Sequence, residues 1–60
     1  MNEQERKNML NLADTLIGEI NRMCVTSQLA EFETMHLYAK KNLEKLFVMI
    51  LQTRFKEYTE

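Results

Sequence analysis

The chain has 60 residues, of which 45% are hydrophobic and 28% charged, with one glycine and no proline. Average usage would give about four glycines and three prolines at this length. Residues that form tight turns are therefore scarce, and long helices are predicted in preference to a sheet. Eight basic and nine acidic side chains give a net charge of −1, which excludes the strong positive field that attracts nucleic acid or anionic lipid.

The small size of the chain limits how it can be stabilised. A domain of this length buries only about 60% of the surface that its unfolded chain exposes. Small domains compensate with disulfides, metals, association or very regular packing. Cys24 is the single cysteine, and no Cys/His cluster has the spacing of a zinc finger. We therefore expect regular helix packing and self-association, with no metal and no cofactor.

The first predicted helix covers residues 3–23. Asn2 and Glu5 have the spacing of a capping box, in which each side chain bonds to the other residue's backbone amide. Apolar residues then recur every three or four positions, which is typical of one face of an amphipathic helix. These residues are Met9, Ala13, Leu16, Ile20 and Met23.

A turn is predicted over residues 24–27. The segment contains no glycine or proline, but the β-branched pair Val25 and Thr26 and a possible cap from Thr26 or Ser27 favour a break in the helix. One unbroken helix that pairs with another chain is the alternative fold.

The second predicted helix covers residues 28–57. Its apolar stripe contains Leu29, Phe32, His36, Ala39 and Leu43, and the spacings mirror those of the first helix about residue 26. Mirrored stripes are what an antiparallel, coiled-coil-like contact requires. The predicted fold is therefore all-α, a single antiparallel two-helix hairpin whose seam is formed by the two stripes.

The C-terminal part of the second helix is the densest apolar segment. At 1.5 Å per residue the second helix would be about 45 Å long and the first about 30 Å, so the second helix is the longer one and this part is predicted to project past the apolar stripe of the first helix. Its candidate interface residues are Leu46, Phe47, Met49, Ile50, Leu51, Phe55 and Tyr58. We expect a second copy to cover them about a two-fold axis, which gives a homodimeric four-helix assembly.

Two features could carry chemistry but have simpler explanations. Glu33 and His36 form a Glu-x-x-His pair of the kind found in di-iron bundles, with Glu19 predicted opposite Glu33. One such spacing is common, so no metal site is predicted. Cys24 is expected to be a buried spectator, because two helices of this length cannot enclose a nucleophile and its base. No catalytic residue is predicted, and the chain is not expected to be an enzyme.

Lys40, Lys41 and Lys45 form the one basic cluster. A small nucleic-acid-associated regulator would use such a face, yet Lys40 and Glu44 also have the spacing of an ordinary surface ion pair. Nucleic-acid binding is therefore the alternative hypothesis, together with a subunit of a larger structural assembly.

The preferred hypothesis is a protein-interaction module. The longest apolar run, residues 46–51, is far shorter than the roughly 20 residues of a membrane span. The polar start of the chain lacks the pattern of a secretory signal, so we expect a cytoplasmic location. The predicted partners are a second copy and a larger protein, on which the chain would act as adaptor, inhibitor or regulator.

Overall fold

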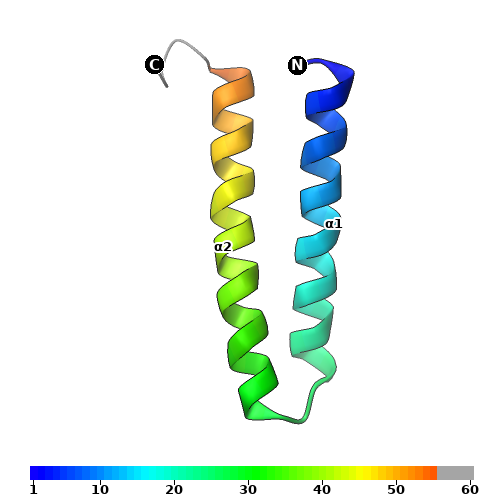
Figure 1. Cartoon of the computed structure of the whole chain (residues 1–60), viewed down its shortest axis with the longest axis vertical. Coiled ribbons are helices and arrows are strands. Elements are labelled where there is room, and N and C mark those ends of the chain that lie inside the picture. Colours follow the sequence, from blue (N-terminus) through cyan, green and yellow to red (C-terminus); the bar gives the residue numbers. More distant parts are fainter. Residues whose placement is uncertain (56–60) are drawn as a thin grey trace.

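The fold is an all-helical hairpin, as predicted. The computed structural model describes residues 1–55, which form α1 (Glu3–Val25) and α2 (Leu29–Arg54), packed against each other along their length (Figure 1). The break lies at residues 26–28, so an unbroken helix is excluded, and α2 ends at Arg54 rather than at the predicted residue 57.

The capping box predicted at the start of α1 is present. The Asn2 side chain accepts a hydrogen bond from the Glu5 backbone N–H at 2.8 Å, and the Glu5 carboxylate accepts one from the Asn2 N–H at 3.0 Å. These bonds satisfy two of the amide groups that a helix start leaves without partners. Glu3 and Glu5 also lie at the positive end of the helix dipole, so α1 begins here for local reasons.

The turn needs no glycine because its backbone stays extended. Thr26 has φ −72° and ψ 142°, and Gln28 has φ −103° and ψ 119°. The Thr26 N–H donates to the Arg22 carbonyl at 3.0 Å and ends α1, while the Thr26 hydroxyl accepts from the Gln28 N–H at 3.1 Å. A β-branched residue favours extended backbone, so Thr26 can end the helix at a position where many helices have a glycine.

The two helices form one layer, with the start of α1 and the end of α2 at the open end of the hairpin (Figure 1). Its Cα atoms extend over 44 × 21 × 11 Å. The helices have 23 and 26 residues, and the first turns of α1 run beside the last turns of α2. α2 is the longer helix, as predicted, but it is shorter and α1 is longer than expected. The last turns of α2 therefore do not project past the apolar stripe of α1.

The core of a single layer is small. Within residues 1–55, the buried apolar side chains are Met9 and Leu16 of α1 and Ala39 of α2. Domains usually bury their apolar surface between at least two layers of secondary structure. A lone pair of helices covers one strip of each helix and leaves the rest exposed.

Candidate protein-interaction surface

The contact line of α2 runs along a different strip from the one expected. Residues turned toward α1 are buried or half-buried at intervals of three and four; they are Met35, Ala39, Asn42, Leu46, Met49 and Thr53. Of the predicted strip on α2, only Ala39 is buried, while Leu29, Phe32, His36 and Leu43 are exposed. The apolar residues of α2 cover too much of its circumference for spacing alone to select the strip that packs.

The predicted strip of α1 lies closer to the observed contact. Met9 and Leu16 are buried and Ala13 and Met23 are half-buried, whereas Ile20 is exposed at one edge. The contact line of α1 therefore agrees with the spacing of its apolar residues, and the rotation of α2 is the main difference.

This rotation places two sets of apolar side chains on one side of the layer. Each residue turns about 100° around its helix, and in an antiparallel pair the same offset from the contact line leads to the same side on both helices. We call this side the apolar face. Its exposed side chains are Leu10, Ile17 and Ile20 of α1 and Leu29, Phe32, Leu43, Phe47 and Ile50 of α2.

Few polar groups interrupt the apolar face. The ring of His36 stacks on Phe32, with centroids 6.5 Å apart and planes 5° apart. Cys24 lies at the turn end and is exposed, so the prediction that it is buried is wrong. The same angular positions at the open end hold Arg6 and Arg54. Lys40 is exposed seven residues before Phe47, so it lies on the same side of α2 as Phe47. The face is therefore largely apolar, with a lysine near its middle and arginines at one end.

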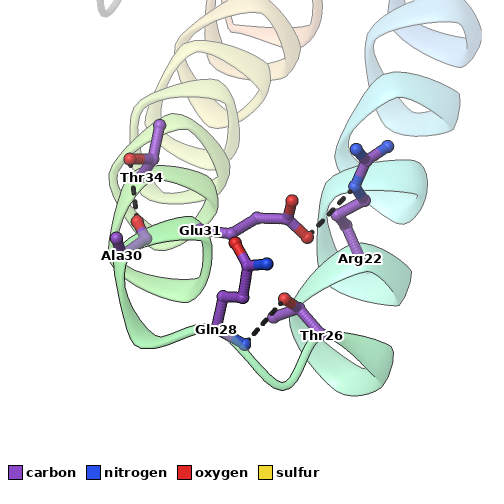
Figure 2. A network of polar contacts seen from close by, with 6 residues as sticks. All are labelled: Arg22, Thr26, Gln28, Ala30, Glu31 and Thr34. Atoms are coloured by element: carbon purple, nitrogen blue, oxygen red, sulfur yellow. Dashed lines mark hydrogen bonds and ion pairs between the residues drawn. The ribbon is translucent and has the colours of Figure 1, made fainter.

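The opposite side of the layer, the polar face, has bonds that join the two helices near the turn. Arg22 Nε lies 3.3 Å from a carboxylate oxygen of Glu31 (Figure 2). The Thr26 hydroxyl, followed by the Arg22 guanidinium, holds the pKa of Glu31 below its ordinary value. Both causes act by bonding to the charged form of the carboxyl group.

A second polar contact lies farther along the helices. Asn42 Nδ2 donates to both carboxylate oxygens of Glu19, at 2.9 and 3.1 Å. The remaining exposed side chains on this face are mostly uncharged polar groups and lysines, with one tyrosine and one valine; they include Asn8, Asn11, Thr15, Thr34, Tyr38, Lys41, Lys45, Val48 and Gln52. The two faces thus differ sharply in polarity.

The predicted interface residues divide among three directions. Phe47 and Ile50 lie on the apolar face, Leu46 and Met49 are half-buried against α1, and Leu51 and Phe55 lie on the side of α2 away from α1. Tyr58 lies outside the described residues. The prediction missed the α1 half of the face, where Ile17 and Ile20 follow Leu10 and Ala13 at helical spacing.

The alternative chemistries find little support in the geometry. Glu19 is bonded to Asn42 on the polar face and is not opposite Glu33. No group of three His, Cys, Asp or Glu side chains in residues 1–55 is arranged to hold a metal ion. The basic cluster is divided: Lys41 and Lys45 lie on the polar face, and Lys40 points to the other side of α2.

A shallow hollow lies beside the turn, lined by Thr26, Ser27, Gln28, Leu29 and Phe32. It joins the turn end of the apolar face, and its lining contains no titratable side chain. In the described part of the chain, neither helix is long and apolar enough to cross a membrane.

Comparisons with known protein families, with curated proteins and with solved structures found no match to this chain. The two unlike faces of the hairpin are the features from which a function can be inferred.

Proposed function

We propose that this chain is a non-enzymatic protein-interaction module that works as a homodimer. The apolar faces of two hairpins pack together into a four-helix assembly, and the polar faces remain outside, where a larger protein would bind. In this role the chain acts as an adaptor, inhibitor or regulator.

The observation that carries this proposal is the apolar face on a single-layer hairpin. Fully burying one large apolar side chain contributes about 1.5 to 3 kcal/mol, and the face holds eight such side chains that are 37% to 72% exposed. Contiguous exposed apolar surface of this kind typically marks a binding site.

The size of the face suits a second copy. The Cα atoms of the layer extend over 44 Å by 21 Å, a rectangle of roughly 900 Å², so one side of the layer has room for the ~800 Å² of accessible surface that each partner buries in a stable protein interface. A two-fold axis covers the same patch on both copies at once. In such a dimer each hairpin would form the second layer that covers the apolar face of the other.

Two substitutions of equally exposed residues test the proposal. Phe47 on the apolar face and Leu37 on the side of α2 away from α1 are both 63% exposed. Phe47→Glu is expected to give single chains with reduced helix content, because it places a charge in the dimer contact. Leu37→Glu is expected to remain a dimer. Light scattering coupled to size exclusion gives both masses, and equal behaviour of the two variants would contradict a contact through the apolar face.

A further inference from the structure

His36 is the one histidine of the chain, and it lies within the α2 half of the apolar face. Its side chain is exposed, and its ring stacks on Phe32 with centroids 6.5 Å apart and planes 5° apart. Leu43 follows seven residues later, so it lies on the same side of α2 as His36. A second copy that covers Phe32 and Leu43 therefore also covers the imidazole between them, whichever way that copy is turned.

Two charged groups of α2 lie within one turn of His36. They are Glu33 before it and Lys40 after it. Glu33 lies toward the side of α2 away from α1, and no ion pair joins it to His36 within the described residues. Lys40 lies on the apolar face, so a proton on the imidazole would add a positive charge one turn from the lysine ammonium. Like charges at this spacing destabilise a helix.

The part of α1 beside His36 brings no charge to the apolar face. Ile20 and the Cys24 thiol lie on this side of the layer near the turn. Glu19 and Arg22 lie on the polar face, where each has a bond to α2. Asp14 points away from α2. An imidazolium at His36 would therefore have no carboxylate of its own α1 beside it.

A second copy would bring further positive charges to the contact. Its apolar face carries Arg6, Lys40 and Arg54, and its own His36 would be covered as well. Glu3 lies at the edge of the face and is 3.9 Å from Arg6. The charges around a covered His36 are therefore mainly positive, and the side chains against it are mainly apolar.

We infer that proton uptake by His36 dissociates the homodimer in mildly acidic solution. This inference rests on the proposed homodimer and adds its regulation. A histidine ordinarily takes up a proton at about pH 6.5. Covering an imidazole with apolar side chains disfavours its charged form, so the dimer holds His36 neutral while the single chain can protonate it. The dimer is therefore most stable above that pH and weakens as the pH falls below it.

The dissociation constant of the dimer at several pH values tests the inference. Sedimentation equilibrium over a dilution series measures this constant for the full chain. One dimer covers two histidines, so the constant should rise by about ten-fold or more between about pH 7.5 and about pH 5.5. Glu31 stays ionised over this range because its pKa is lowered from 4.5, so the contact at the turn does not contribute to the change.

His36→Gln and His36→Leu are the matched controls, because neither side chain takes up a proton. Glutamine keeps a polar group at this position, and leucine extends the apolar strip. Both variants should form dimers at about pH 7.5 whose dissociation constants change by less than about two-fold on going to about pH 5.5. The α-amino group is the same in all three proteins, so its titration cancels in the comparison.

A wild-type dissociation constant that stays unchanged or falls in acid would overturn the inference while leaving the homodimer intact. Variants that weaken in acid as much as the wild type would do the same, because the proton would then bind elsewhere. A mass of one chain for the wild type at about pH 7.5, well above the ordinary pKa of a histidine, would overturn the proposed function and this inference with it.

Discussion

Asn42 donates from its amide nitrogen to both carboxylate oxygens of Glu19, at 2.9 and 3.1 Å, and so joins α2 to α1 near the middle of the hairpin. Because each residue of an α-helix is rotated by about 100° from the one before it, the direction of one side chain fixes the directions of its neighbours. With Asn42 at the contact, Leu43 is turned by about 100° onto the apolar face. The polar contact thus belongs to the same rotation of α2 that leaves Leu43 exposed on the apolar face.

Removing this contact should destabilise the protein. Asn42→Ala leaves the half-buried Glu19 carboxylate without its donor, and the expected loss is about 1 to 3 kcal/mol of unfolding free energy. Asn21→Ala, at an exposed position of α1, is the control and should change it by less than about 0.5 kcal/mol. Urea unfolding at one fixed protein concentration measures both, and similar losses would show that the Asn42 contact does not hold the helices.

Truncating the core should cost more than truncating the polar face. Leu16 is 8% exposed, so Leu16→Ala is expected to lower the unfolding free energy by about 2 to 5 kcal/mol through lost burial and a cavity. Lys41→Ala on the polar face should change it by less than about 0.5 kcal/mol. If the lysine variant is as unstable as the leucine variant, the assignment of the core is mistaken.

The sequence predicted the helices far better than the rotation of α2. Caps, apolar spacing and scarce glycine are local properties, and they located α1 and the capping box at Asn2. Packing against α1, and not local sequence, decides whether α2 buries the strip with Phe32 and Leu43 or the strip with Met35 and Leu46. It depends on which strip packs against Leu16 and on the Asn42 and Glu31 contacts across the helices, and apolar spacing along α2 carries no information about either.

Gly18 offers a stabilising substitution. It lies inside α1 with no positive φ, and a β-carbon there would meet nothing within 4 Å. Gly18→Ala should therefore raise the unfolding free energy by about 0.5 to 1 kcal/mol, because alanine loses less backbone freedom on forming a helix. A rise in the thermal midpoint measures this. A clear fall would mean that another chain approaches α1 closely at this residue.

Acid should weaken the contact at the turn. The pKa of Glu31 is lowered in the folded chain from an ordinary value of 4.5, so its bonds to Thr26 and Arg22 contribute stability above that pH. The contribution is lost as the pH falls through the lower, folded pKa. The thermal midpoint of Glu31→Gln should thus lie below that of the wild type at pH 7, and the gap should close in acid. A gap that stayed constant down to about pH 2 would be incompatible with an ionised Glu31 in this contact.

The most direct test of the proposed dimer is the mass of the unmodified protein in solution. Sedimentation equilibrium at tens of micromolar should give twice the 7.2 kDa of one chain. On dilution the mass and the helical circular dichroism should fall together, because in the proposed dimer the second copy would cover the apolar face that a single layer leaves exposed. A mass of 7.2 kDa with full helix content at every concentration would contradict the account.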